Sequence, residues 1–540
     1  MMSRDDGPVS VRLLYLAAFA GGMTTLGIEI AMSRLIGAVL GTSDIVWAAV
    51  ITLVLIYLTG GYFLGGRWAD RSPSTRTFFQ LLAWTAFTAG LLPVLARPLM
   101  RAMAAAFFLA SLDIVVLGIA GLTVAVLFAV PVTLLGCVSP FVIRLAIADT
   151  RFAGDTAGRV YAFSTLGGIL GAFGPVLILI PAVGTAWTFV FFAGLLLSAA
   201  LLGLYRVSPR DALRYSWMPP VLALALFWGV HGPVKPPPPG TSLLYEAETP
   251  YNYVQVVEVT DGTVARQPIG TRLLLLNEGQ GVHSVYHPDT IRTGATWDMF
   301  LAAPYFASPA VAPESIDRVA IIGLAGGTIA RQYTAVYGPI AIDGIEIDPG
   351  IVEAGRRYFG MTMPNLNVIV DDGRYALSRL QGDYDLVAID AYRVPYIPWQ
   401  LTTVEFFQEV QGRLAPNGVV MINVGRTAAD RRLVDAMTAT LLQVYPSVHA
   451  IDVPGSFNTM LVATQTQTTP EFLASNLSAL PETIHPFLAE ALALAYRSLV
   501  PVHPSTVVFT DDRAPVETLI NAMVLEFILG EDPLSQLGGR

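Results

Sequence analysis

Long runs of apolar residues, separated by short polar stretches, dominate the first 231 residues of the chain. Each run approaches or exceeds the roughly 20 residues that an α-helix needs to cross a bilayer. Six spans are expected, at residues 11–38, 43–66, 77–97, 114–146, 158–181 and 186–205. The pattern therefore predicts a multi-span transmembrane domain over residues 1–231 and a location in the cell membrane.

Arginines mark one end of these spans. They lie before or at the start of the first span, or border the loops after the second, fourth and sixth spans: Arg4, Arg12, Arg67, Arg71, Arg76, Arg144, Arg151, Arg159, Arg206, Arg210 and Arg214. The opposite loops hold chiefly Arg97 and Arg101. Because cytoplasmic loops carry the excess of Lys and Arg, the N-terminus is expected in the cytoplasm.

A seventh apolar segment, residues 217–231, decides on which side the rest of the chain lies. As a helix it is about 22 Å long, short of the ~30 Å hydrocarbon core. Pro219 and Pro220 weaken its first turn. If the segment crosses, the second half is outside. We expect that it does not fully cross and that the second half faces the cytoplasm.

The pattern changes after a stiff, proline-rich linker at residues 232–242. Residues 253–259 and 271–277 read as strands, with an Asp-Gly turn signal between them. They predict a small β-hairpin region over residues 243–300. From residue 317 strands and helices alternate, with strands expected at 318–323, 341–346, 366–370, 386–390, 418–424, 447–453 and 458–464. This alternation predicts an α/β, Rossmann-like domain over residues 301–540, built on a doubly wound parallel sheet.

Composition agrees with a membrane protein and narrows the chemistry. The chain is 54% hydrophobic and 14% charged, far from the roughly 25% charged residues of a soluble domain. Residues 1–231 hold 14 Arg against 9 Asp and Glu, whereas the remainder holds 18 basic and 32 acidic residues. The acidic second half argues against a nucleic-acid partner. One lysine, one cysteine and six unclustered histidines exclude a P-loop lysine and a disulfide framework, and no metal site is expected.

A few charged residues fall inside the expected spans, namely Glu29, Arg34 and Asp44. They indicate either a ligand path with an intramembrane pair or charges near the span ends. Small residues such as Gly167, Gly168 and Gly171 are typical of close helix packing. We favour helix packing.

Polar and glycine residues follow the expected strands of the second half. In a doubly wound sheet, ligands bind beyond the carboxyl ends of the strands. The residues that come there are Gly323, Gly326, Gly327, Glu346, Asp348, Asp371, Asp372, Gly373, Asp390, Tyr392, Arg393, Asn423 and Gly425. Glycines let the backbone approach a ligand, and a carboxylate after the second strand can accept both ribose hydroxyls. Asp348, just before Pro349, is also expected to cap a helix.

These motifs carry a resemblance. The stretches IIGLAGGTIARQY, GIEIDPGIVEAGRRYF, VIVDDGRYAL and YDLVAIDAY are similar to the spermidine synthase (polyamine aminopropyltransferase) family. The membrane half resembles the multi-span segment fused to many bacterial members. The resemblance implies transfer of an aminopropyl group from decarboxylated S-adenosylmethionine to putrescine or a related amine, and assembly as a dimer.

The resemblance also implies roles for individual residues. Glu346 would hold the ribose, and Asp372 with Gly373 would hold the adenine. Asp390 would contact the attacking amine as the catalytic carboxylate. Gln280 lies near the family's donor-binding glutamine. A donor made in the cytoplasm also favours a cytoplasmic second half.

The chain departs from the family at three places. Gly326 replaces an aspartate that contacts the donor, Arg393 replaces a second acidic residue, and Trp297-Asp298 stands for a Tyr-His pair. Asp298 and Tyr392 are further candidates at the acceptor site, and Asp298 is the next candidate for the base. Arg393 would suit the carboxylate of full S-adenosylmethionine. Two alternatives therefore stay open: a transferase that uses S-adenosylmethionine on another acceptor, such as a lipid, and a non-catalytic, nucleoside-binding transport or sensor protein.

Overall fold

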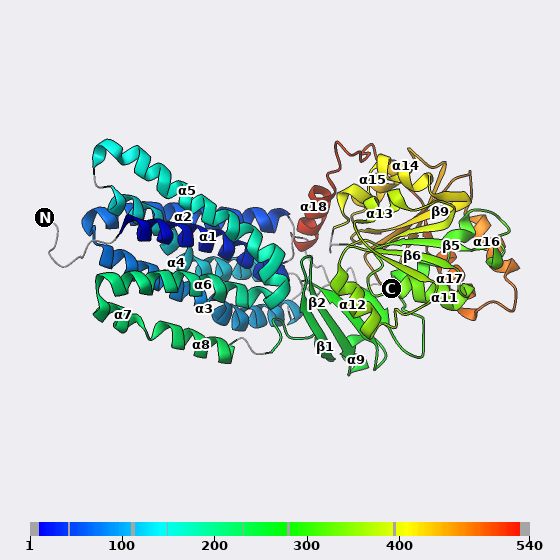
Figure 1. Cartoon of the computed structure of the whole chain (residues 1–540). Helices are drawn as coiled ribbons and strands as arrows, with labels where there is room; N and C mark the ends of the chain where they lie inside the picture. The colour runs from blue at the N-terminus through cyan, green and yellow to red at the C-terminus, as the bar shows by residue number, and fades with distance from the viewer. Residues whose placement is uncertain are drawn as a thin grey trace. The chain divides into compact units, whose positions relative to one another are not determined.

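The computed structural model describes residues 10–40, 44–109, 114–147, 149–229, 232–277, 281–392 and 396–529. The chain divides into two compact units, Met1–Pro236 and Pro237–Arg540. Gln280 and Arg393 lie outside the described residues. Figure 1 shows a helical first unit and a second unit built around sheets.

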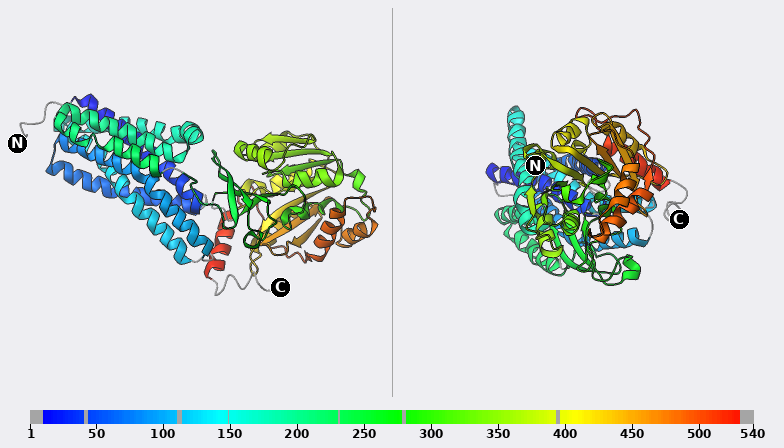
Figure 2. Two further views of the ribbon diagram at one scale, coloured as in Figure 1. Left: turned by 90° about the horizontal axis from the view of Figure 1, so that it is seen from below. Right: turned by 90° about the vertical axis from the view of Figure 1, so that its right-hand side faces the viewer.

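The first unit is a bundle of long helices, which lie side by side in both Figures 1 and 2. Its elements are α1 Val11–Leu40, α2 Asp44–Arg71, α3 Thr75–Leu109, α4 Ile114–Ala146, the 3-10 helix η1 Thr150–Phe152, α5 Ala153–Gly174, the π-helix η2 Pro175–Leu179, α6 Ile180–Val207, α7 Pro209–Tyr215 and α8 Met218–Gly229. Within the described residues, five helices are long and apolar enough to cross a membrane. The longest, Thr150–Val207, is broken at Gly184, where φ is 82°. The break falls between the fifth and sixth expected spans.

Glycines bring the backbones of α1 and α5 together. A Cβ atom on Gly167 would lie 2.0 Å from the carbonyl oxygen of Phe19, and one on Gly171 would lie 2.1 Å from that of Met23. No side chain fits at either position. This close approach agrees with the packing interpretation of the glycines in α5.

The chain from α7 to the linker runs beside α3. Asp211 accepts a 2.8 Å hydrogen bond from Arg76 near the start of α3, and the ring of Trp217 lies 5.0 Å from that of Phe87. The carbonyl of Gly232 accepts a 2.8 Å bond from Arg97. Arg76 and Arg97 are about 32 Å apart along a helix, close to the ~30 Å hydrocarbon core. Together, α7 and α8 thus follow α3 over a longer distance than residues 217–231 alone. Whether this segment crosses the membrane stays a prediction.

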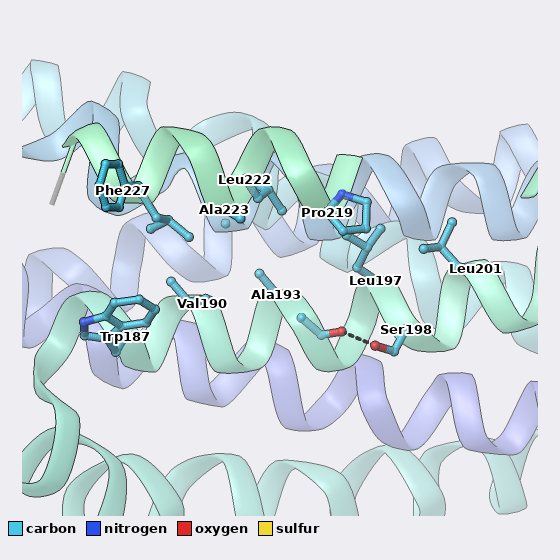
Figure 3. A pocket seen from close by; sticks show the side chains of 13 residues that line it. Trp187, Val190, Ala193, Leu197, Ser198, Leu201, Pro219, Leu222, Ala223 and Phe227 are labelled. Atoms are coloured by element: carbon cyan, nitrogen blue, oxygen red, sulfur yellow. Dashed lines mark hydrogen bonds between the residues drawn. The ribbon is translucent and has the colours of Figure 1, made fainter. Parts of the chain in front are cut away.

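An apolar groove lies between α6 and α8 (Figure 3). Its volume is about 600 Å³, and its lining includes Trp187, Val190, Ala193, Leu197, Leu201, Pro219, Leu222, Ala223 and Phe227. The hydroxyl of Ser198, also in the lining, already donates a 2.7 Å hydrogen bond to the carbonyl of Gly194. None of the lining residues is ionisable, so the groove suits hydrocarbon and does not suit a charged amine.

The second unit begins with a four-stranded antiparallel sheet in the order β1-β2-β3-β4. The strands are β1 Thr241–Glu248, β2 Tyr253–Val259, β3 Arg272–Leu276 and β4 Val282–Tyr286. The hairpin predicted from the sequence is its centre, β2 and β3. Asp261 caps the short helix α9, Gly262–Ala265, which takes the place of the expected turn.

A second sheet of eight strands has the order β12-β10-β11-β9-β8-β5-β6-β7. The strands are β5 Arg318–Ile322, β6 Ala341–Glu346, β7 Leu366–Val370, β8 Tyr384–Ile389, β9 Leu414–Gly425, β10 Ser447–Asp452, β11 Asn458–Thr464 and β12 Leu499–Val500. Strands β5 to β9 are parallel to one another, as predicted. The far edge is not, because β11 is antiparallel to both β9 and β10. The order reverses at β5, whose neighbours are β6 and β8.

Helices cover both faces of this sheet (Figures 1 and 2). They are α10 Thr296–Phe300, α11 Thr328–Tyr337, α12 Pro349–Tyr358, α13 Gly373–Arg379, α14 Val404–Gln411, α15 Arg432–Leu441, α16 Glu471–Ala479, α17 Pro486–Arg497 and α18 Val516–Leu529, with 3-10 helices η3 Ala303–Phe306, η4 Pro313–Ser315 and η5 Trp399–Leu401. Apolar residues of α10, α11 and α17 form one core with the sheet, and those of α14, α15 and α18 form the other. The two cores hold the strand ends rigidly, which is what a site at those ends needs.

Candidate active site at the ends of strands β5, β6 and β8

The turn after β5 packs directly against the end of β8. Gly323 has a φ of 89°, and a Cβ atom there would lie 2.6 Å from the backbone nitrogen of Ala391. Only glycine meets both requirements. The Asp390 N–H donates a 2.9 Å bond to the carbonyl of Ile322. The ends of β6 and β8, which carry Glu346 and Asp390, therefore flank the glycine turn.

The rest of the glycine turn is held by the first sheet. The Gly326 N–H donates a 2.8 Å hydrogen bond to the hydroxyl of Ser284 on β4. A Cβ atom on Gly326 would lie 3.0 Å from Ser284 and from Phe359. Gly327, with a φ of 83°, is the N-cap of α11. A side chain at Gly326, where the family is expected to carry an aspartate, would press on Ser284.

Glu346 is a buried carboxyl at the end of β6. One oxygen accepts a 2.9 Å bond from the Ala325 N–H, and the other a 3.1 Å bond from the Asp348 N–H. Burial raises the pKa of Glu346 to about 7, although the backbone donors lower it in part. Each oxygen keeps a lone pair, so the carboxyl can accept further hydroxyl groups. This is the acceptor that a ribose requires.

Asp348 has a structural role. It caps α12 through the Gly350 N–H at 2.9 Å, as the sequence predicts. Its second oxygen accepts bonds from Thr249 at 2.6 Å and from Asn252 at 2.9 Å, and its side chain is fully buried. These bonds tie the β1–β2 turn to α12. The geometry does not favour Asp348 as a ligand-binding residue.

The segment after β7 closes a third side of the turn. Asp371 accepts a 2.9 Å bond from the Asp372 N–H, and Asp372 caps α13 through the Arg374 N–H at 3.0 Å. A Cβ atom on Gly373 would lie 2.6 Å from the side chain of Ile322, at the end of β5. The segment therefore lies beside the glycine turn. The adenine role of Asp372 and Gly373 stays a prediction.

Asp390 is the second carboxyl of the site. Its Oδ1 accepts a 2.8 Å hydrogen bond from the side-chain amide of Asn423, and the N–H of the nearby Trp297 side chain also lowers its pKa. Burial raises the pKa of Asp390 to about 7, against the effect of these two donors. The Tyr392 hydroxyl donates a 3.2 Å bond to the backbone carbonyl of Asn423. A carboxyl with such a pKa is suited to proton transfer near neutral pH.

Asp298 and its neighbour Trp297 differ in what their side chains contact. Asp298 is buried and accepts bonds from the Thr293 hydroxyl at 2.7 Å, the Gly294 N–H at 2.8 Å and the Gln332 amide at 2.6 Å. Those bonds give Asp298 a structural role and do not favour it as the base. Its neighbour Trp297 reaches Asp390 instead. Sequence reasoning overlooked this contact, because nothing in the local pattern of α10 indicates it.

The same part of the second unit matches known proteins. Residues 306–475 match the family described as "Spermine/spermidine synthase domain". This range holds the glycine turn, Glu346 and Asp390. This match lies within the second unit.

Two polyamine aminopropyltransferases are similar to this chain in sequence. A "probable polyamine aminopropyl transferase" of Bifidobacterium longum is 31% identical over 294 residues, which are 52% of this chain and 62% of that protein. A polyamine aminopropyltransferase of Vibrio vulnificus is 29% identical over 180 residues, 32% of this chain and 59% of its own length. The chain thus spans about 60% of the length of these two proteins.

A solved structure, a probable spermidine synthase from Corynebacterium glutamicum, is 18% identical with a TM-score of 0.37 and covers 50% of this chain and 98% of that chain. Among the residues that the structure describes, no group of three or more His, Cys, Asp or Glu side chains could hold a metal ion.

Proposed function

We propose that the second unit is a polyamine aminopropyltransferase, which transfers an aminopropyl group from decarboxylated S-adenosylmethionine to putrescine or a related amine. One observation carries the proposal: a buried carboxyl, Glu346, and a partly buried one, Asp390, each with a pKa of about 7, follow the strands on either side of a glycine turn. The match of residues 306–475 to the spermine/spermidine synthase domain supports it. The test is formation of the thioether nucleoside from the decarboxylated donor and putrescine.

The donor would lie along the glycine turn. Glu346 accepts the ribose hydroxyls, and the segment Asp371–Gly373 borders the adenine. The turn and the segment pack against the end of β5, so the reacting carbon is held at one place. Such positioning supplies a large part of the rate enhancement in a transfer between two bound molecules.

Asp390 would act on the amine. A primary amine is protonated at neutral pH and attacks only after it loses that proton. Asp390 accepts the proton, the nitrogen lone pair forms the new C–N bond, and the C–S bond breaks. The sulfonium sulfur keeps the bonding electron pair and leaves as a neutral thioether. A carboxyl with a pKa of about 7 is ionised often enough to do this at neutral pH.

A second candidate function is transfer from full S-adenosylmethionine to another acceptor. Two residues favour this second function. Gly326 stands where the family is expected to carry an aspartate, and Arg393 adds a positive charge after β8. A cation there would repel a diamine and pair with the carboxylate of full S-adenosylmethionine. Binding of the two donor forms, measured by calorimetry on the full chain, separates the candidates.

The helices of the first unit would anchor the chain in the cell membrane. Their arginine-rich ends carry Arg76, whereas Gly232 lies at the Arg97 end of α3. With the arginine-rich ends in the cytoplasm, residue 232 emerges on the other side. We propose on this basis that the second unit is extracytoplasmic, in contrast to the cytoplasmic location expected from the sequence; the donor would then have to reach that side.

A cysteine placed at Ser242, in a Cys137→Ser background, tests the side. We expect an impermeant thiol reagent to label it on intact cells, before lysis. Pro73→Cys, at the arginine-rich end, is the matched control and should be labelled only after lysis. If residue 242 is not labelled before lysis, α7 and α8 do not cross the membrane and the second unit lies in the cytoplasm.

A further inference from the structure

A side chain from the neighbouring strand β9 fixes the orientation of the Asp390 carboxyl group. Asn423, near the end of β9, donates from its amide nitrogen to the Asp390 Oδ1 at 2.8 Å. Asn423 is 5% exposed. An amide has an oxygen and a nitrogen that can exchange places by a half-turn of the group. If Asn423 turned, its oxygen would face the carboxylate and repel it.

The orientation of the Asn423 amide depends on a residue one strand farther out. Asn458, at the start of β11, donates from its amide nitrogen to the Asn423 oxygen at 2.8 Å. The two strands are antiparallel, and the pairing of Asn458 with Gly425 and of Met460 with Asn423 brings the two amides together. Asn458 therefore keeps the Asn423 oxygen turned away from Asp390.

The Asn458 amide is oriented in its turn. The Ser456 hydroxyl donates to its oxygen at 2.9 Å, and the Asn458 backbone N–H donates to the Ser456 oxygen at 3.0 Å. The bonds from Ser456 to Asp390 thus run in a single direction, each group accepting from one neighbour and donating to the next. Hydrogen bonds aligned in this way reinforce one another.

We propose that Asn458 is a positioning residue for Asp390 and acts through Asn423, so that the antiparallel edge of the sheet orients the base. The catalytic consequence rests on the proposed function, whereas the effect on Asp390 does not. Tyr392 is the titratable neighbour whose charge couples to that of Asp390. Burial and the Asp390 charge raise the pKa of Tyr392, so it stays neutral while Asp390 titrates.

The test reads the ionisation of Asp390 through the nearby Trp297, whose side-chain N–H lowers the pKa of Asp390. In the full chain in nanodiscs, subtracting the emission of Trp297→Phe isolates the Trp297 signal. We expect this signal to titrate with a midpoint near 7 and to lose that transition in Asp390→Asn. The same titration is then recorded for Asn423→Ala and for Asn458→Asp, with thermal unfolding of each variant as the check on folding.

Asn458→Asp conserves shape but removes the donor, so the Asn423 amide is free to turn. In Asn423→Ala and in Asn458→Asp, we expect the midpoint of the Asp390 titration to rise by about one pH unit. The loss of one hydrogen bond to a charged group shifts a pKa by about that amount. Asn458→Leu, also of similar shape, should raise it as well. An unchanged midpoint in folded Asn458→Asp and Asn458→Leu would overturn the proposal. A shifted midpoint in a chain that forms no product would support the positioning role and refute the proposed function.

Discussion

Replacing Asp390 by Asn is expected to reduce turnover by roughly 10²–10⁴-fold, the usual range for loss of a general base. The amide keeps the size of the side chain and can still meet Asn423 and Trp297, but it cannot accept a proton. Because Asp390 faces the acceptor, donor affinity should stay within a few-fold of wild type. Steady-state kinetics with calorimetry on the same preparation measures both quantities.

If Asp390 is the base, the pH dependence of kcat/KM has a definite direction. The ionised carboxylate is the active form, so kcat/KM of the wild type should rise as the pH increases through about 7. Asp390→Asn should lose that rise. Asp298→Asn is the matched control, because Asp298 is a neighbouring buried carboxyl whose hydrogen bonds go to Thr293, Gly294 and Gln332. If Asp390→Asn keeps wild-type turnover, the base lies elsewhere.

Replacing Glu346 by Gln is expected to weaken donor binding by more than tenfold. A carboxylate that accepts a hydroxyl group contributes about 1.5–3 kcal/mol per hydrogen bond, and about 1.4 kcal/mol is a factor of ten. The ionised form is the better acceptor, so wild-type affinity should increase as the pH rises through about 7. Calorimetry on the full chain measures the affinity.

Asp348→Asn is the control for this site. Asp348 lies two residues after Glu346 but is fully bonded to Thr249, Asn252 and the start of α12. This variant should lower the melting temperature and leave donor affinity within a few-fold. Equal affinities for Glu346→Gln and wild type would remove the ribose assignment.

The positions of Glu346 and Asp390 could be predicted because they follow from a general rule. The carboxyl ends of parallel strands meet at one edge of a sheet, so residues just after the strands come together. The bounds of β6 and β7 agree residue for residue with the prediction. The apolar strands and the glycine after β5 were sufficient for this part of the site.

Contacts that join distant segments could not be predicted in the same way. Trp297 lies 93 positions before Asp390 in the sequence, and Asn458 lies 35 positions after Asn423. Asn458 belongs to no local pattern, and the resemblance marks Trp297 only as half of the pair that stands for Tyr-His. The sequence placed the acidic candidate at Asp298, one position from the side chain that reaches the site, because a carboxylate is the more familiar catalytic group.

The seventh apolar segment shows a related limit. Its hydropathy suggests a boundary at residue 217, but the pair of Asp211 with Arg76 draws α7 into the same run along α3. An ion pair between residues 135 positions apart leaves no periodic signal. A length counted from hydropathy alone therefore underestimates how much of the chain before residue 232 lies along α3.

The most direct test of the proposed function is product formation by the purified full chain in nanodiscs. The chain is incubated with decarboxylated S-adenosylmethionine and putrescine, and the products are separated, identified and quantified by mass spectrometry. We predict equal amounts of the thioether nucleoside and of an amine heavier by one aminopropyl group, both greatly reduced in Asp390→Asn. No aminopropylated amine from the wild type, while the donor is bound, would contradict the proposed function.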